Sequence, residues 1–287
     1  KHFIASRGCP YACTYCFNHS YNKLYQGKGK RVRFRSVDNL LDEVESVVKK
    51  YPTEFVYFQD DTFILDKRWV EEFSEKYKKR INQPFHCHVR ANLMDEDIAK
   101  LLKDANCYSV HIAVESGNDR LRNNVLKRAM SEQDIYSACD LLHKYDIKFM
   151  LQNILGLPSG SLKDDFETLE MNIKCKPTYA WASIFQPYPG TDLAQMCLNN
   201  NLISVQDLGK ISSSFFERSV LDIQDKKEVE YLQKLFAIAV EHPGIYKSGL
   251  LNTMLSLPDS PEIRQLLDNL YKSFRKTADK KLYGIDI

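Results

Sequence analysis

The sequence predicts an α/β protein built on a partial (βα)6 barrel, with a C-terminal helical segment after it. Three observations predict this fold: six apolar runs alternate with amphipathic helical patterns, polar residues follow each run, and the alternation stops after residue 200. Right-handed crossovers return each helix to the sheet, so the strands are expected to be parallel. No reversal of strand order is evident, which makes a flat doubly wound sheet the second choice.

The predicted elements follow from hydrophobic periodicity and capping residues. Strands are predicted at 2–6, 54–59, 85–90, 108–114, 147–155 and 179–185. Helices are predicted at 36–51, 66–80, 95–105, 118–127, 132–145, 162–175 and 191–200. The first of these helices carries one apolar stripe and has Ser36 at its N-cap position. We therefore expect the barrel over residues 1–200 and a C-terminal helical cap that shapes substrate access over 201–287, with helices at 225–241 and 261–275.

Composition excludes several classes of protein. The chain has 287 residues, of which 44% are hydrophobic and 27% charged, so it is not disordered or fibrous. The net charge of +2 argues against a surface built to hold nucleic acid. No apolar run reaches membrane-spanning length and no secretory pattern opens the chain, so we expect a cytoplasmic protein without membrane contact. Strand-like sequence begins directly at Lys1, which suggests a piece of a longer polypeptide.

The eight cysteines fall into two groups. Three of them, Cys9, Cys13 and Cys16, lie within eight residues of one another beside Gly8 and Pro10, a pattern that core packing does not explain. Their thiolates would bind an iron–sulfur cluster or zinc. The others are expected to behave as small buried hydrophobes, namely Cys87, Cys107, Cys139, Cys175 and Cys197.

Two kinds of site remain open for the three clustered cysteines. Three thiolates on a four-iron cluster leave one iron open to chemistry. Alternatively, His19 completes a Cys3His zinc site, and the protein is a zinc-stabilised binding module without enzymatic activity.

Polar residues, or loops that contain glycine and proline, follow all six predicted strands. In a parallel barrel such strand ends meet at one mouth, which predicts an active site there. The segments are the cysteine loop, 59–62, Arg90 with Asn92, 115–118, 152–160 and 186–191. Structural roles compete with this interpretation: Asp60 and Asp61 can cap a turn, Ser116 or Asn118 a helix, and Ser161 the helix at 162. Glu115, directly after an apolar run, needs a partner.

The cysteine spacing C-x3-C-x2-C, with aromatic Tyr15 before the last cysteine, resembles that of the radical S-adenosylmethionine (radical SAM) enzymes. The resemblance implies a 4Fe–4S cluster on Cys9, Cys13 and Cys16, with S-adenosylmethionine bound at the open iron. One-electron reduction would cleave this cofactor to methionine and a 5′-deoxyadenosyl radical, which removes hydrogen from a substrate.

The resemblance also implies roles for residues at the strand ends. Asp60 or Asp61 would bind the methionine amine, where the chain departs from the common Gly-Gly-Glu. Arg90, or as a second choice Arg128, would bind the methionine carboxylate. The remaining contacts to the cofactor are expected from Tyr15, Phe17, Glu115, Ser116, Asn153 and Gly156. No catalytic residue beyond the cluster and cofactor site is implied.

A closer resemblance is to the cobalamin-binding subfamily, on residues 7–11, 16–18, 60–63 and 187–191. It implies a methyltransferase acting on an unactivated centre. The chain has no Asp-x-His-x-x-Gly motif, so an N-terminal cobalamin-binding domain is expected to be absent from it and any cobalamin to be bound by sequence outside it. A cobalamin-independent cyclase, epimerase or rearrangement enzyme is the alternative. Expected partners are an electron donor such as flavodoxin or ferredoxin, and a small-molecule or peptide substrate.

Overall fold

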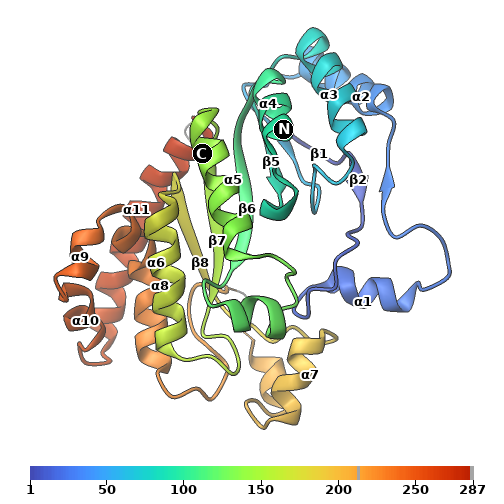
Figure 1. Cartoon of the computed structure of the whole chain (residues 1–287). Helices are drawn as coiled ribbons and strands as arrows, with labels where there is room; N and C mark the ends of the chain where they lie inside the picture. The colour runs from blue at the N-terminus through green and yellow to red at the C-terminus, as the bar shows by residue number, and fades with distance from the viewer. Residues whose placement is uncertain (212–213, 285–287) are drawn as a thin grey trace. The chain divides into compact units, whose positions relative to one another are not determined.

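The computed structural model describes residues 1–211 and 214–284. Its main sheet has the strand order β1-β4-β5-β6-β7-β8 (Figure 1). These strands span His2–Phe3, Val56–Phe58, Phe85–Val89, Cys107–Glu115, Lys148–Leu155 and Tyr179–Ile184. The order never reverses along the chain, and β1/β4, β4/β5 and β5/β6 are parallel pairs. The α/β prediction is confirmed, and the order is that of a barrel-type sheet rather than a doubly wound one.

The predicted first strand at 2–6 is interrupted. After β1 the chain leaves the main sheet, and β2 (Ser6–Arg7) pairs antiparallel with β3 (Arg33–Phe34). The buried Asp60 carboxylate after β4 accepts hydrogen bonds from the backbone N–H groups of Ala5 and Ser6. These bonds satisfy N–H groups that the main sheet would otherwise have paired.

One compact unit of the chain comprises Lys1–Pro10, Tyr25–Ala113 and Ser131–Met150. Its helices are α2 (Val37–Lys50), α3 (Lys67–Arg80), α4 (Glu96–Asp104) and α5 (Glu132–Lys144), with a short 3-10 turn, η1 (Ala91–Leu93). Phe58 of β4 and Phe85 of β5 pack edge-to-face on Phe73 of α3. The N-cap residue of α3 is Asp66, whose side chain accepts the N–H groups of Arg68 and Trp69.

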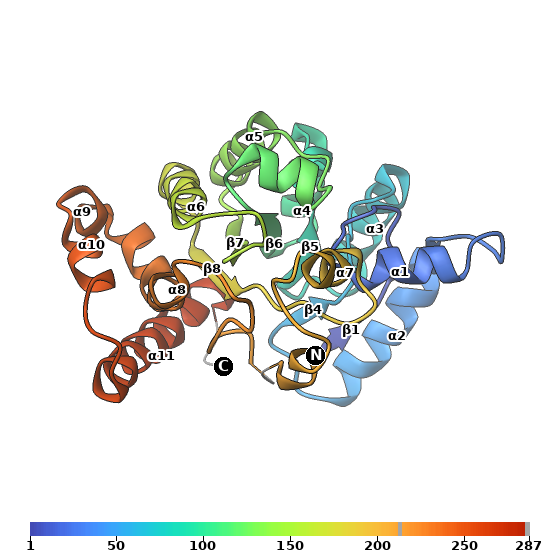
Figure 2. The same cartoon turned by 90° about the horizontal axis from the view of Figure 1, so that it is seen from below.

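A second compact unit comprises Tyr11–Leu24, Val114–Met130 and Leu151–Ile287. Its helical elements are α1 (Phe17–Leu24), η2 (Arg120–Val125), α6 (Leu162–Cys175), α7 (Asp192–Asn199), η3 (Asp207–Lys210), α8 (Lys226–Glu241), α9 (Pro243–Lys247), α10 (Leu250–Leu255) and α11 (Pro261–Tyr283). Figure 2 shows α8 between α6 and α11, and its buried Leu232 and Phe236 share a core cluster with Ala180 and Ala182 of β8. The predicted C-terminal helices therefore pack against the last βα unit.

Two helix predictions differ from the structure, and some helices were not predicted. The helix predicted at 118–127 is a single π-helical turn, η2, and the last helix runs on to Tyr283. Helices α1, α9 and α10 were not predicted; α1 carries Phe17, Tyr21 and Leu24 at helical spacing, but all three are exposed. Within the described residues, no helix is both long enough and apolar enough to cross a membrane.

Candidate active site

The cysteine motif lies between β2 and α1, and the boundary between the two units falls within it. Cys9 belongs to the first unit, whereas Cys13 and Cys16 belong to the second. None of the three forms a disulfide; Cys13 is buried, and Cys9 and Cys16 are partly exposed. The five separated cysteines are all buried, as predicted.

Backbone contacts within the second unit fix the position of Cys13. The neighbouring Thr14 donates through its N–H to Leu126 O at 3.2 Å and through its hydroxyl to Val125 O at 2.8 Å. Its carbonyl accepts the N–H of Leu193 at the start of α7. These three bonds satisfy buried polar groups of the loop and attach it to η2 and α7.

Polar contacts also hold α1 against the start of α7. His19 Nε2 lies 3.1 Å from Asp192 Oδ2, and Lys23 Nζ lies 2.5 Å from Asp192 Oδ1. Ser20 donates its hydroxyl to Gly190 O at 2.6 Å. The His19 ring is thus engaged by a carboxylate, which gives it a role without zinc.

Cys13, Tyr15, Glu115 and Arg128 form a buried polar cluster in the second unit. Arg128 Nη1 donates to Cys13 Sγ at 3.4 Å and to the Tyr15 hydroxyl at 3.1 Å. The Tyr15 hydroxyl donates in turn to Glu115 Oε1 at 2.7 Å. The sequence required a partner for Glu115, and Tyr15 is that partner.

Burial changes the protonation behaviour of this polar cluster. Desolvation raises the pKa of Tyr15 well above its usual value, and the neighbouring Arg128 opposes that shift. Although desolvation acts against the charge of Arg128, its pKa is raised, because Tyr15, Glu115 and Cys13 surround the guanidinium. At neutral pH the cluster therefore presents a neutral phenol and a cation beside the Cys13 sulfur.

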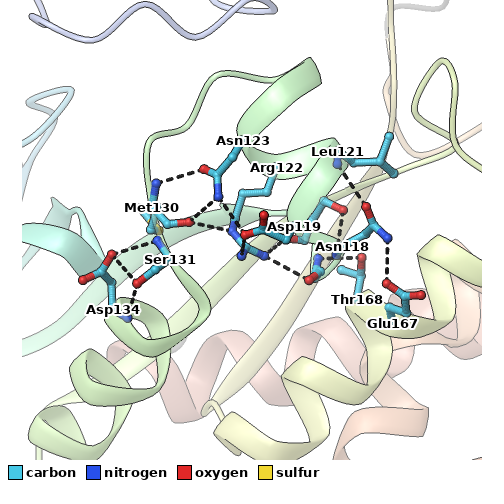
Figure 3. A network of polar contacts seen from close by, with 12 residues as sticks. Asn118, Asp119, Leu121, Arg122, Asn123, Met130, Ser131, Asp134, Glu167 and Thr168 are labelled. Carbon is cyan, nitrogen blue, oxygen red and sulfur yellow. Dashed lines mark hydrogen bonds and ion pairs between the residues drawn. The ribbon is translucent and has the colours of Figure 1, made fainter.

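Backbone geometry after β6 places Glu115 and Arg128. Glu115 has a φ of +70°, a left-handed conformation that ends the strand. Arg128 follows η2, and its N–H bonds to Arg122 O at 3.0 Å. Figure 3 shows how the fully buried Arg122 holds this segment: its guanidinium donates to the backbone oxygens of Ser116, Gly117 and Met130, and to the Asp119 carboxylate.

Gly117 brings the loop after β6 close to α6. A Cβ atom there would lie 2.5 Å from Glu167 O, and the Gly117 N–H donates to the Thr168 hydroxyl at 2.9 Å. Ser116 is buried, and its hydroxyl accepts the N–H of Asn118, whose side chain accepts the N–H of Leu121. Asn118 thus accepts a hydrogen bond from the first turn of η2 and Ser116 closes the turn before it, while the N-cap residue of η2 is Asp119.

A cavity of about 240 Å³ lies in the second unit and reaches the buried polar cluster. Tyr15 and Glu115 line one part of it, and aromatic side chains line much of the rest. The other lining residues are Gln152, Ile154, Trp181, Ser183, Ile184, Phe185, Gln186, Tyr188 and Phe215. An apolar wall with a few converging polar groups is typical of a small-molecule site.

The residues predicted within and after β7 form hydrogen bonds to neighbouring elements, mainly α6. The Asn153 side chain is fully buried and exchanges hydrogen bonds with Asn172 of α6, and it also donates to Trp181 O. Gly156 has a φ of +66°, and its N–H donates to the Asp165 carboxylate. Ser161 forms a capping box at α6, which confirms the turn-and-cap interpretation of this loop.

The remaining predicted residues are not members of this polar cluster. In the first unit, Asp60 is buried and hydrogen-bonded to Ala5 and Ser6, whereas Asp61 is exposed. Arg90 is also buried in that unit, and its Nε donates to Asn92 at 3.1 Å. Phe17 is exposed on α1, with its ring 6.3 Å from that of Tyr188.

Two features of the site were not predicted from the sequence, namely the inward-facing Arg122 and the contact between Arg128 and Cys13. Arg122 carries no sequence signal that separates it from surface arginines, because only the π-helical turn directs it inward. Arg128 was the second choice for a carboxylate contact, yet its side chain bonds to Cys13 and Tyr15.

Comparison with known proteins agrees with this geometry. The chain is 28% identical over 211 residues to an uncharacterized methyltransferase of Pyrococcus horikoshii, covering 73% of this chain and 44% of the relative. It is 26% identical over 193 residues to the anaerobic magnesium-protoporphyrin IX monomethyl ester cyclase of Rubrivivax gelatinosus, covering 66% and 33%. The chain thus spans less than half the length of these relatives.

A solved structure shares the fold. The cobalamin-dependent S-adenosylmethionine radical enzyme OxsB, with aqua-cobalamin and S-adenosylmethionine bound, has a TM-score of 0.58 and 16% identity, covering 98% of this chain and 46% of that one. The family model described as the Radical SAM superfamily matches residues 3–171, which include the cysteine motif, β4 to β7 and most of α6. The match decides against the zinc-stabilised binding module, and the chain is an enzyme of the radical SAM superfamily.

Proposed function

We propose that this enzyme is a radical SAM methyltransferase that uses cobalamin bound by sequence outside this chain. Its substrate would be a small molecule or peptide with an unactivated centre. The observation that carries the proposal is the buried polar cluster of Cys13, Arg128, Tyr15 and Glu115 beside the 240 Å³ cavity. A relative described as a methyltransferase and a cobalamin-dependent enzyme of similar fold support the methyl-transfer part.

The donor set fits the 4Fe–4S cluster that the family implies. Three thiols free of disulfides stand on one loop, and a guanidinium lies against the sulfur of Cys13. Thiolates on one loop are the protein ligands that iron–sulfur clusters take. We therefore assign Cys9, Cys13 and Cys16 as the ligands of the cluster.

The same geometry suggests how the chain holds S-adenosylmethionine. Glu115 and Tyr15 line the cavity and offer polar contacts to the ribose and a wall for the adenine, with Phe17 and the backbone of 153–156 as further contacts. Ser116 keeps Asn118 in place, so its contribution is to hold the loop. For the methionine end, Arg90 would bind the carboxylate and Asp61 the amine, because the oxygens of Asp60 already accept three hydrogen bonds.

The cavity walls suit radical chemistry. A bound cluster supplies the electron that cleaves S-adenosylmethionine to methionine and a 5′-deoxyadenosyl radical. Trp181, Tyr188 and Phe215 present aromatic surface that excludes water, while Gln152 and Gln186 offer amides to orient a polar substrate. An apolar wall protects a carbon radical from side reactions.

Cleavage of S-adenosylmethionine is tested with cluster-loaded chain under dithionite. Cys13→Ala should abolish 5′-deoxyadenosine formation, measured by chromatography, while the circular dichroism spectrum stays unchanged. Cys139→Ala replaces a buried cysteine of α5 and should retain the activity. Undiminished cleavage by Cys13→Ala would refute the ligand assignment.

The second candidate activity is a cobalamin-independent cyclization, epimerization or rearrangement, and it is favoured by the similarity to a cyclase. The two candidates leave different products. Methyl transfer by way of cobalamin takes its methyl from S-adenosylmethionine and leaves S-adenosylhomocysteine beside 5′-deoxyadenosine. The longest natural polypeptide that contains this chain should retain cobalamin through gel filtration and form both products. Formation of 5′-deoxyadenosine alone, without retained cobalamin, would favour the second candidate.

The proposed reaction also needs an electron donor and a reducing environment. The family requires a reductant, and flavodoxin or ferredoxin would supply the electron. A reducing cytoplasm is the proposed site of action, since thiol ligands of a cluster stay reduced there. We assign the barrel to residues 1–200 and the shaping of substrate access to 201–287.

A further inference from the structure

A group of aromatic and imidazole rings lies on one face of the sheet in the first unit. His86 and His88 are two residues apart on β5 and therefore point to the same face of the sheet. His111 of β6 is the register partner of His88. Tyr57 of β4 is the register partner of His86. The opposite face of the same strands is apolar, with Phe58 and Phe85 packed against α3.

The three histidines converge on one region of space. One nitrogen from each lies within 4.8 Å of those of the other two. The rings of His86 and His111 are 4.1 Å apart between centroids, and those of His88 and His111 are stacked at 5.0 Å. Three imidazole rings that meet in this way place several nitrogen atoms, the commonest protein ligands of transition metals, in one region.

Neighbouring hydroxyl groups orient the rings. The Ser109 hydroxyl lies 2.7 Å from His86 Nδ1, so Nε2 of this ring faces the other histidines as the ligand atom. The Tyr57 hydroxyl lies 2.9 Å from His88 Nε2 and 3.4 Å from His111 Nδ1, so both nitrogens are directed at the same place. Three ring nitrogens thus lie near one another, and the Tyr57 oxygen lies beside two of them.

We propose that His86, His88 and His111 form a second metal site, separate from the cysteine motif, which binds one Zn²⁺ with Tyr57 or water as the fourth ligand. Zinc prefers imidazole nitrogen at about 2.0–2.1 Å, and a tetrahedral site at that distance separates its nitrogens by about 3.4 Å. The rings therefore move closer by roughly an ångström when the ion enters.

The three histidines were not predicted from the sequence as a metal site. A His-x-His pair within an apolar strand places both rings on one face, which is a weak signal by itself. The third histidine lies on the next strand, and only the register of β5 with β6 brings it beside the pair.

The experiment uses chain loaded with its iron–sulfur cluster, so that the cysteine motif is occupied when Zn²⁺ is added. After gel filtration, elemental analysis should give one zinc per chain in addition to iron. X-ray absorption at the zinc edge should show nitrogen or oxygen neighbours at about 2.0–2.1 Å and no sulfur near 2.3 Å. A sulfur shell, or no retained zinc, would overturn the proposal.

Variants test the ligands separately. His88→Gln and His111→Gln should each weaken zinc binding by about 100-fold or more, since even the partners of ligands cost 10–100-fold. His143→Gln on α5, an exposed histidine, should bind zinc like the parent chain. Iron content and circular dichroism show whether each variant folds. Should a ligand variant fold and bind zinc as tightly as the parent, the assignment fails; should it misfold, the absorption spectrum of the parent chain still decides.

Discussion

Arg128 donates a hydrogen bond to the sulfur of Cys13 at 3.4 Å, and both side chains are buried. The contact joins residues 115 positions apart, and it places a fixed positive charge beside a cysteine that we assign to the cluster. The potential of an iron–sulfur cluster depends on hydrogen bonds to its sulfurs and on nearby charge. Arg128 is therefore in a position to set the potential at which the cluster accepts its electron.

Arg128→Gln should lower the midpoint potential of the cluster, because the reduced, more negative cluster loses a stabilising cation. A differential loss of about 1.4 kcal/mol corresponds to about 60 mV for one electron. A redox titration followed by electron paramagnetic resonance measures the shift. Arg120→Gln changes the net charge equally at an exposed position and should leave the potential unchanged. An unaltered potential in the Arg128 variant would show that the contact does not tune the cluster.

We expect Asp60 to stabilise the fold and Asp61 to bind S-adenosylmethionine. Asp60→Asn weakens the bonds to Ala5 and Ser6 and should lower the free energy of unfolding by about 2 kcal/mol, measured in urea. Asp61→Asn should leave stability within about 0.5 kcal/mol and weaken S-adenosylmethionine binding, measured by calorimetry on cluster-loaded chain. Loss of cofactor affinity in a fully folded Asp60 variant, with none in the Asp61 variant, would reverse the assignment.

Much of the fold could be predicted because it depends on local periodicity. All six predicted strands overlap strands of the main sheet, and helices such as α2 begin at the caps that the sequence indicates. The partners within the site depend instead on tertiary contacts. Glu115 could be recognised as a buried acid in need of a partner, but the choice of Tyr15, 100 residues earlier, follows from the attachment of the cysteine loop to η2.

The role of Asp60 and the presence of α1 could not be predicted either, because both depend on tertiary contacts. Asp60 bonds to residues 54 and 55 positions away because β1 and β4 are neighbours in the sheet. Helix α1 is held against α7 by the contacts of His19 and Lys23 with Asp192, whereas the apolar residues that recur along it, Phe17, Tyr21 and Leu24, are exposed.

Gly8 should be essential for the cysteine loop. Its φ is +89°, and a Cβ atom there would lie 2.0 Å from Arg31 O, which is backbone and cannot move aside. Gly8→Ala should separate β2 from β3 and reduce the iron bound per chain after cluster reconstitution to less than half. Gly27 has a similar φ of +77°, but nothing lies within 4 Å of a Cβ atom added there. Gly27→Ala therefore introduces the backbone strain without the steric clash and serves as the control. If the two variants bind equal amounts of iron, the close contact is not the reason for the glycine.

Asp165 should make stability depend on pH. It is buried beneath the Gly156 N–H, and desolvation, with Asp164 and Asp225 nearby, raises its pKa from 3.8 to about 8. The folded chain therefore holds a proton that the unfolded chain releases, and the contribution of Asp165 to stability is complete below about pH 4 and lost as pH rises to about 8. Asp165→Asn keeps an oxygen to accept the Gly156 N–H and removes the titration. Its free energy of unfolding in urea, relative to the parent chain, should rise steadily between pH 4 and pH 8, whereas the exposed Asp140→Asn controls for net charge. A difference that stays constant across this range would mean that Asp165 is ionised in the folded chain.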